Sequence, residues 1–459
     1  MYTELLGLCG FEKDDIEKER PRIDRAFEIL GIGEEDIKTA EERVKTFFSI
    51  ELPSIRKVLG IWMKQLIDIV LTKEEGKKVI YTSFPCENRI GAAFNLAGVY
   101  CQPPEIVFGM ALGQIFGKLV PVLEVAEQNG MPPGLGMCSF NTSRLGAIAS
   151  GMAPKPDLTI TSGFFCDQTA KTDDFLHEVY GVPNVFIDNC MDSGWDVYPA
   201  IPDNRVKYFA GEMKDAFAEA QDILGVKISD ETFHQARVEA AKLWLSMGRV
   251  FELMRAEPQP ISQVDLNLFY WMIGTPESRI IAEGTEAIKL LAKDIKGRID
   301  KGIGVVEKGA PRVVFFSPSI ADPALGKMFE EAGLSIASSA FFWLSPSEMV
   351  KSKYSTFEEK SVESQMKKGV YHSSAGLVGR FREAAESWNA DGLFYYFHFS
   401  CRPLCISSTI MKKDIEKKLG IPVLALEGDF FDSRDYSVQA LRTRVETFAE
   451  MLRANKKAA

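Results

Sequence analysis

Two stretches of the sequence decide the fold: PDLTITSGFFCDQT, residues 156–169, and ADGLFYYFHFSCRP, residues 390–403. Each has an aspartate at its second position, continues as a largely apolar run, and reaches a cysteine just beyond that run, Cys166 in the first and Cys401 in the second. Apolar runs of this length are typical of buried strands in a parallel sheet. The repetition predicts two α/β units built on one plan, each with a cysteine on the turn after a strand.

Short apolar runs alternate with helical segments on either side of these two stretches, which is the pattern of a parallel sheet covered by helices. The runs expected to form strands are residues 79–84, 157–161, 184–188, 312–316, 393–397 and 423–426. Apolar residues at helical spacing predict helices within residues 1–75, 104–123, 142–150, 209–224, 230–255, 276–300 and 437–454. We therefore expect an α/β fold with two Rossmann-like parallel-sheet domains facing a cleft, plus helical N-terminal and middle segments.

The length of 459 residues allows several domains, at about 150 residues for each. The shifts in pattern place a helical N-terminal cap at 1–75, a first α/β domain at 76–208, a helical segment at 209–308 and a second α/β domain at 309–459. The formal charge of −10, without a basic run interleaved with aromatics, argues against nucleic acid as a partner.

The N-terminus lacks a basic segment followed by an apolar one, so no secretory signal is expected. The long apolar stretch 104–123 carries Glu105, Gln114 and Lys118, and we expect it to be a buried helix, not a membrane span. These features predict a cytoplasmic protein that does not enter a membrane.

The cysteines are the candidate functional residues. Eight are too few for a disulfide scaffold, and a buried, inert thiol is the ordinary role of a cytosolic cysteine. Cys166 and Cys401 do not fit that role, because polar residues follow them on turns at the carboxyl ends of strands, where open α/β sheets bind ligands. Cys138 lies in a Gly/Pro-rich loop just before a predicted helix, whose N-terminus favours a thiolate.

Three further cysteines are weaker candidates: Cys86 directly after a strand, Cys101, and Cys405 four residues beyond Cys401. Cys9 and Cys190 are expected only to pack. No Cys-x2-Cys pair advertises structural zinc, and thiolates from distant loops in a chain with four histidines fit an iron–sulfur cluster better. The spacing alone does not identify the metal.

Other chemistries have weaker signals. Glu87, Asp167 and Glu427 lie at strand ends, where they could transfer protons or merely cap turns; Glu87 is the candidate catalytic residue. His398 is expected to pack or to position a neighbour. The stretch GQIFGK, residues 113–118, resembles a phosphate-binding loop but is one residue short and lacks the Ser/Thr, so we do not expect the chain to hydrolyse ATP.

Several stretches resemble the catalytic D component of 2-hydroxyacyl-CoA dehydratases, a family that includes subunits of ATP-dependent benzoyl-CoA reductase. They are FPCE (84–87), CSFNTSRLG (138–146), PDLTITSGFFCDQTAK (156–171), FSCRPLC (399–405) and EGDFFDSRDYSVQALRTRVETF (427–448). The resemblance covers about residues 75–455 in element order and length.

This resemblance implies a [4Fe–4S] cluster held by Cys138, Cys166 and Cys401, with the fourth iron open to water, another ligand or the thioester carbonyl. It also implies three partners: a homologous or identical second chain, an ATP-hydrolysing iron–sulfur activator, and a CoA thioester. The reaction would be a one-electron reduction of the thioester to a ketyl radical, with the cofactor supplying the chemistry.

Two alternatives stay open. The additional thiols Cys86, Cys101 and Cys405 would also suit a relative with a double-cubane [8Fe–9S] cluster that reduces small molecules. The other alternative is a partner subunit whose cluster is structural or lost. Counting iron atoms separates the [4Fe–4S] enzyme from the double-cubane reductase.

Overall fold

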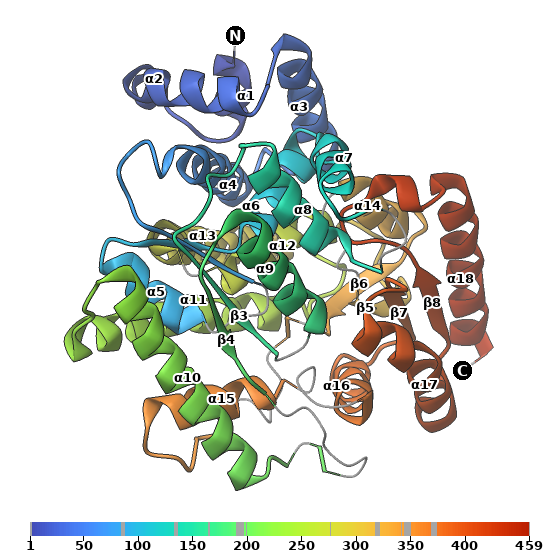
Figure 1. Ribbon diagram of the computed structural model, residues 1–459. Coiled ribbons are helices and arrows are strands. Elements are labelled where there is room, and N and C mark those ends of the chain that lie inside the picture. The colour runs from blue at the N-terminus through green and yellow to red at the C-terminus, as the bar shows by residue number, and fades with distance from the viewer. Residues whose placement is uncertain are drawn as a thin grey trace.

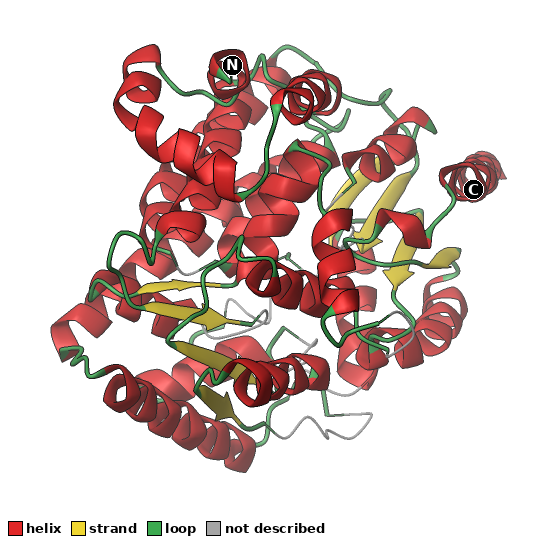
Figure 2. Cartoon of the chain, turned by 45° about the horizontal axis from the view of Figure 1, so that its top comes forward, coloured by secondary structure: helices red, strands yellow, loops and turns green. Residues whose placement is uncertain are grey.

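The computed structural model describes residues 2–83, 88–132, 136–163, 166–189, 197–198, 200–275, 277–316, 322–340, 342–343, 350–368 and 374–458 (Figure 1). Within these residues the chain forms two four-stranded sheets, both parallel throughout. The sheets occupy separate regions of the molecule, each surrounded by helices (Figure 2). The predicted α/β class with two parallel-sheet units is confirmed.

The two sheets have the same topology. The first has the order β2 (Tyr100–Gln102), β1 (Val79–Thr82), β3 (Leu158–Ser162), β4 (Asn184–Ile187). The second has the order β6 (Ser335–Ser339), β5 (Arg312–Phe316), β7 (Gly392–Phe397), β8 (Val423–Glu427). In each sheet the order reverses between the first and third strands, and ligands bind in such crevices beyond the carboxyl ends of the strands. Cys166 follows the third strand of one sheet and Cys401 the third strand of the other.

One hydrogen-bonding device recurs in both units and explains the aspartate that precedes each third strand. Asp157 accepts the backbone N–H of Val79, which begins β1, at 2.7 Å. Asp391 accepts the N–H of Arg312, which begins β5, at the same 2.7 Å. Each carboxylate satisfies a strand-end donor that would otherwise lack a partner and fixes the register between first and third strands. This is physical support for the repeat predicted from the sequence.

The predicted strands are found, and two edge strands were missed. β2 has only three residues, and β6 has the sequence Ser-Ile-Ala-Ser-Ser, whose small polar residues have low strand propensity. Both are fully buried, so packing against helices and pairing with β1 and β5 determine their conformation.

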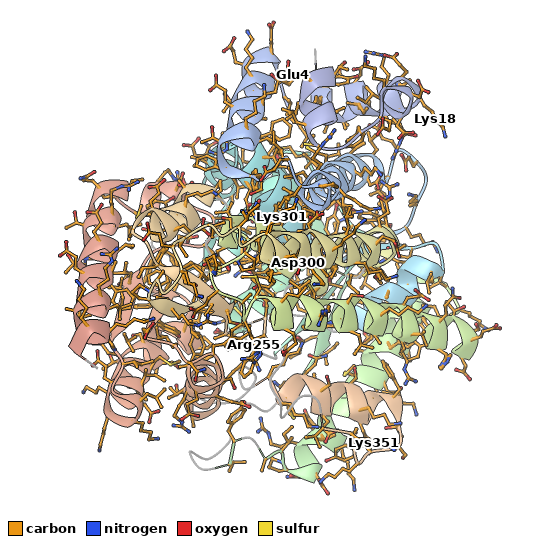
Figure 3. All side chains as sticks on the ribbon, turned by 180° about the vertical axis from the view of Figure 1, so that it is seen from behind. Glu4, Lys18, Arg255, Asp300, Lys301 and Lys351 are labelled. Atoms are coloured by element: carbon orange, nitrogen blue, oxygen red, sulfur yellow. The ribbon has the colours of Figure 1, made fainter. Side chains whose placement is uncertain are left out.

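The N-terminal helices gather at one end of the molecule, at the top of Figure 1, where Figure 3 labels Glu4 and Lys18 from behind. They are α1 (Thr3–Leu8), α2 (Lys13–Ile29), α3 (Glu34–Phe47) and α4 (Pro53–Leu71). Helix α4 is the buried member: the Trp62 side chain is fully enclosed and its Nε1 donates to the Leu268 carbonyl at 3.0 Å. The cap is therefore joined to the middle helical segment through its core.

The middle segment consists of α10 (Asp203–Leu224), α11 (Asp230–Leu253), α12 (Gln263–Tyr270), the 3-10 turn η2 (Trp271–Gly274) and α13 (Ser278–Asp300). Helix α13 packs on α4 and α11, and its end at Asp300 lies on the face shown in Figure 3. The short α12 was not predicted. Its Asp265 accepts the N–H and hydroxyl of Ser49, so α12 links the cap to the second unit.

The remaining helices surround the sheets. In the first unit they are α5 (Asn88–Leu96), α6 (Pro104–Val107), the π-helix η1 (Phe108–Ile115), α7 (Val120–Gln128), α8 (Ser139–Ala149) and α9 (Asp167–Tyr180). In the second they are α14 (Pro323–Glu331), α15 (Phe357–Met366), α16 (Ser374–Ser387), α17 (Arg402–Leu419), the short η3 (Ser433–Asp435) and α18 (Val438–Ala458), which runs along the right edge of Figure 1.

The single buried helix expected over 104–123 is instead three pieces, α6, η1 and α7. The chain turns at Gly117, whose φ of 66° is left-handed, before α7 begins. No helix in the described part of the chain is long and apolar enough to cross a membrane.

The repeat gives a matched pair of helix ends, at Gly181 after α9 and Gly420 after α17, with φ of 65° and 69°. We expect Gly181→Ala to destabilise the protein by about 1 kcal/mol, because a side chain is strained in this conformation. The control is Gly211→Ala inside α10, where the added methyl meets nothing within 4 Å. It should stabilise by about 0.5–1 kcal/mol. Urea unfolding midpoints of Gly181→Ala and Gly211→Ala test this prediction. A shift of the same sign in both variants would contradict the left-handed conformation at Gly181.

A buried carboxylate joins the second unit to α12. Glu330 on α14 accepts the N–H of Gln263 at 2.7 Å and the hydroxyl of Ser262 at 2.9 Å. Burial raises the pKa of Glu330 to about 7 from 4.5, although Lys327 and these hydrogen bonds act in the opposite direction. At a pH between 4.5 and about 7, Glu330 holds a proton in the folded state that it has lost in the unfolded state. Its burial therefore lowers the stability of the fold as the pH rises through this range.

We expect Glu330→Gln to flatten the pH dependence of stability, since the variant keeps a neutral side chain at every pH. The wild type should lose up to about 3 kcal/mol more than the variant between about pH 4.5 and pH 7. Urea unfolding at both ends of that range measures the difference. Glu331→Gln is the control, because Glu331 is exposed and pairs with Arg442 on the surface at 2.9 Å. Equal pH dependence in wild type and Glu330→Gln would refute the assignment.

Candidate functional site

Each of the three strongest cysteine candidates caps the N-terminus of a helix. Cys138 is the N-cap of α8, Cys166 of α9 and Cys401 of α17. The α8 helix begins earlier than the sequence predicted, which moves Cys138 from the preceding loop to the cap itself. Helix N-termini carry unpaired N–H groups and the positive end of the macrodipole, so each of these positions favours a thiolate.

The Cys166 and Cys401 loops lie side by side although they belong to different units. Asp167 and Arg402, the residues that follow the two cysteines, form an ion pair with Oδ2 and Nη1 3.1 Å apart. Lys171 also pairs with Asp167, at 2.9 Å. The pairs are exposed, so they contribute little stability, and they show that the two helix starts are neighbours at the surface.

The thiols themselves lie inward. Cys138 and Cys401 are buried and Cys166 is partly buried. Burial raises the pKa of all three thiols above the ordinary value. Cys166 and Cys401 further raise the pKa of Cys138, and Cys166 raises that of Cys401, so the thiols lie within electrostatic reach of one another. Without a cation these groups are protonated, and metal binding would release their protons.

A single side-chain amide joins the three cysteine loops. The Nε2 atom of Gln168 donates to the carbonyls of Gly136 at 2.6 Å and Ser400 at 2.5 Å. Its Oε1 accepts the N–H of Cys138 at 3.3 Å. Gln168 itself lies two residues after Cys166 and is 4% exposed. All the hydrogen-bonding atoms of this amide are therefore used between the loops that carry the thiols.

Asn141, one turn into α8, contacts a sulfur directly. Its Nδ2 lies 3.4 Å from the Cys138 Sγ and 3.5 Å from the Gln168 Oε1. The Oδ1 of Asn141 is buried and has no hydrogen-bond partner among the described residues. An amide in this position donates to a thiolate and stabilises its negative charge.

A buried polar network beside the thiols connects the two units. Asp429, just after β8, accepts the N–H of Ser139 at 3.3 Å and also the Ser139 hydroxyl. Within the second unit the network continues through His398, whose Nε2 lies 3.0 Å from Asp429 and whose Nδ1 lies 2.5 Å from the Ser400 hydroxyl. His398 therefore packs within this network, and its role as a positioning residue stays a prediction.

Aromatic packing adjoins this network. The Phe140 ring lies 4.4 Å from that of Phe431 and 5.4 Å from that of Phe430, measured between centroids. Phe140 belongs to α8 of the first unit, and the other two rings follow β8 of the second. The contact between the two units therefore combines aromatic packing with the hydrogen bonds of the Asp429 network.

The helices that carry Cys138 and Cys166 are held together by a buried ion pair. Arg144 on α8 and Asp173 on α9 are 2.8 Å apart and almost completely enclosed. Arg144 also donates to the carbonyl of Tyr81 in β1 at 3.2 Å. Breaking a buried pair of this kind costs about 3–5 kcal/mol, so the spacing of the two helix starts is firmly set.

The additional cysteine candidates have different surroundings. Cys405 is partly exposed, one turn along α17 from Cys401, and its N–H donates to the Cys401 carbonyl at 2.8 Å. Cys101 is fully buried within β2 and is not at a helix start. Cys86 lies outside the described residues, as does Cys190.

The predicted carboxylates and the phosphate-loop-like stretch also lie in different surroundings. Asp167 is at the surface in the ion pair described above, and Glu427 is exposed at the end of β8. Glu87 lies outside the described residues. The first half of the GQIFGK stretch, residues 113–115, forms the end of the buried π-helix η1, and its Lys118 pairs with Asp36 at 2.7 Å, so it does not form a strand–loop–helix phosphate site.

Sequence reasoning missed Gln168, Asn141 and Asp429 as site residues. The signal for Gln168 was present in the polar residues that follow Cys166, and Asp429 lies in the tail segment EGDFFDS. Neither could be placed without the fold, because their partners are 232 and 290 residues away along the chain.

The chemistry of the donor set suits an iron–sulfur cluster. Three thiols at three helix N-termini, with an amide donor at one sulfur, are soft ligands in a setting that stabilises negative charge. Among the described residues, no three His, Cys, Asp or Glu side chains meet as closely as a single metal ion requires.

Comparison with known proteins gives the family. Residues 99–452 match the protein family described as "2-hydroxyglutaryl-CoA dehydratase, D-component". The chain is 24% identical to the alpha subunit of (R)-2-hydroxyglutaryl-CoA dehydratase from Acidaminococcus fermentans, over 66% of this chain and 61% of that relative. It is 22% identical to the (R)-2-hydroxyisocaproyl-CoA dehydratase alpha subunit from Clostridioides difficile, over 86% and 95% of the two chains. The chain thus spans about three fifths of the first relative and nearly all of the second.

A reductase matches as well: one of the subunits of benzoyl-CoA reductase from Thauera aromatica is 22% identical, over 83% of this chain and 90% of that relative. These relatives are parts of enzymes, which agrees with the dehydratase-like enzyme that the sequence predicted. The matched region includes Cys138, Cys166 and Cys401. The chain belongs to the 2-hydroxyglutaryl-CoA dehydratase D-component family.

Proposed function

We propose that this chain is the iron–sulfur catalytic subunit of an ATP-activated 2-hydroxyacyl-CoA dehydratase, or of a related acyl-CoA reductase of the benzoyl-CoA type. Cys138, Cys166 and Cys401 would hold a [4Fe–4S] cluster. The observation that carries the proposal is the convergence of three helix-capping cysteine loops from both α/β units around the amide of Gln168. Membership of the family supports the reaction class.

The reaction needs an electron because the hydrogen lost from the β-carbon of a 2-hydroxyacyl-CoA is barely acidic. When bound, the cluster would supply one low-potential electron to the thioester carbonyl, giving a ketyl radical anion that expels the α-hydroxyl as hydroxide and acidifies the β-hydrogen; once that hydrogen leaves as a proton the electron is given back, so dehydration is redox-neutral overall. Cys138, Cys166 and Cys401 would hold this cluster, and the thioester carbonyl would bind beside it.

The chain's own residues would hold and insulate this centre. The N-termini of α8, α9 and α17 stabilise the negative charge of the thiolates, and Asn141 donates to the sulfur of Cys138. The aromatic contact of Phe140 with Phe431 and the buried Asp429 network limit water at the joint. A site that excludes water protects a reactive radical from side reactions.

The proposal includes partners. The relatives are named as subunits, and a second related or identical chain would complete the enzyme. ATP would be hydrolysed by a separate iron–sulfur activator, which is supported by the GQIFGK stretch, whose first three residues end a buried π-helix and whose Lys118 is already paired. The substrate would be a CoA thioester.

Iron content is the first test. Anaerobically purified protein should hold about four iron atoms per chain, and Cys138→Ala, Cys166→Ala and Cys401→Ala should each lose most of that iron. Cys9→Ala is the matched control, since Cys9 is a buried thiol in the N-terminal cap. Iron retained in all three ligand variants would refute this ligand set.

The runner-up function is a double-cubane reductase that acts on small molecules, and the observation in its favour is the position of Cys405 one turn from Cys401. Cys405→Ala separates the two. A [4Fe–4S] site predicts unchanged iron in this variant, whereas an [8Fe–9S] site predicts about eight iron atoms in the wild type and a large loss in the variant.

Turnover is the second test. The loaded enzyme, with its partner chain, an activator and ATP, should dehydrate at least one of 2-hydroxyglutaryl-, 2-hydroxyisocaproyl-, phenyllactyl- or lactoyl-CoA, or reduce benzoyl-CoA. Activity should fall at least about 100-fold in Cys401→Ala, because one cluster ligand is lost, and should persist in Cys9→Ala. An anaerobic assay by mass spectrometry of the CoA products measures this. An enzyme with its full iron content that converts none of these thioesters would contradict the proposed reaction.

A further inference from the structure

We propose that Gln168 is a positioning residue that sets the geometry and the reduction potential of the centre, acting through the Cys138 loop and through Asn141. The inference rests on the proposed function, since it assumes that a cluster binds the three thiols. It goes beyond the ligand set, because Gln168 would act on the ligands from outside, through hydrogen bonds to their loops.

The first step of the argument is connectivity. Gln168 bonds to the carbonyls of Gly136 and Ser400 and to the N–H of Cys138. Gly136 and Ser400 lie within two residues of Cys138 and Cys401, and Gln168 lies two residues after Cys166. One rigid amide plane therefore links all three thiol loops, two from the first unit and one from the second.

The second step is charge. The contacts between residues that follow the cysteines, such as Asp167 with Arg402, are ionic and partly exposed, whereas Gln168 is neutral and buried. A neutral amide can tie the loops together without placing a formal charge beside three thiolates. Its carbonyl oxygen accepts the N–H of Cys138 and has a second lone pair for another donor.

The third step is the hydrogen bond to sulfur. Asn141 Nδ2 lies within reach of both the Gln168 Oε1 and the Cys138 Sγ, at 3.5 Å and 3.4 Å. Gln168 thus helps to orient the amide that donates to a ligand sulfur. Hydrogen bonds to cluster sulfurs are among the factors that set the reduction potential, and outer residues that orient ligands typically change metal affinity about 10–100-fold when they are lost.

The test compares iron release and potential in Gln168→Met, which keeps the length of the side chain but cannot form these hydrogen bonds. We expect iron transfer to a chelator to be at least about tenfold faster than in the wild type. The midpoint potential, from an anaerobic titration followed by electron paramagnetic resonance, should shift to a more negative value, because the oriented donor to Cys138 is lost. Asn141→Leu should shift the potential in the same direction.

The double variant Gln168→Met/Asn141→Leu gives a sharper measurement. If Gln168 acts through Asn141, the shift in potential of the double variant should be smaller than the sum of the two single shifts. Additive shifts would overturn the role of Gln168 through Asn141.

Gln221→Met is the matched control for a lost amide. Gln221 on α10 also makes two backbone hydrogen bonds, accepting from Ile228 at 2.8 Å and donating to Phe217 at 3.3 Å, away from the thiols. Iron release and potential should be at the wild-type value in this control. If Gln168→Met does not fold, Gln168→Asn is the second variant, since its shorter side chain cannot span the loops but keeps the polarity.

The outcomes separate the two proposals. A wild-type protein that binds no iron overturns the proposed function itself. A wild-type protein that binds iron, together with a Gln168 variant that has the wild-type release rate and potential, overturns only the inference about Gln168. Faster release and a shifted potential in the Gln168 variant, with neither in the Gln221 control, support it.

Discussion

The molecule depends on one constraint: the carboxyl-terminal ends of its two sheets must meet. A parallel sheet places the carboxyl ends of all its strands, and the N-termini of the helices that follow, on the same side. Two such sheets bring their helix starts together only if the units are locked in one orientation. Asp429 provides that lock, since this buried carboxylate of the second unit accepts two hydrogen bonds from Ser139 at the start of α8. The site exists because both units are held across this contact.

The site combines groups with opposing requirements. Thiols that are buried resist ionisation, as the raised pKa values of Cys138, Cys166 and Cys401 show. Helix N-termini and an amide donor favour the ionised form. The proposed cluster would resolve the conflict, because its cationic core would replace the thiol protons and leave anionic thiolates beside the helix ends. Buried thiols in this setting would suit a soft metal centre better than a free thiolate nucleophile.

Much of this was readable from the sequence, and the reasons for the failures are physical. Long apolar runs such as that around β7 identify buried strands, and the repeated Asp–strand–Cys order identified both units and two of the three helix-capping cysteines. The short edge strands β2 and β6 could not be recognised, because tertiary pairing overrides their weak propensity. Gln168 could not be predicted as a site residue for a related reason. Its role depends on hydrogen bonds to Gly136 and Ser400, which only the fold brings next to it.

The thiols are shared unequally: α8 and α9 of the first half supply two, and α17 of the second half supplies one. With the proposed ligand set neither half alone would supply all three thiols, so metal loading would cross-link halves that fold from distant parts of the polypeptide. Cofactor assembly would then serve as a checkpoint of folding, in which a chain whose halves failed to dock could not mature.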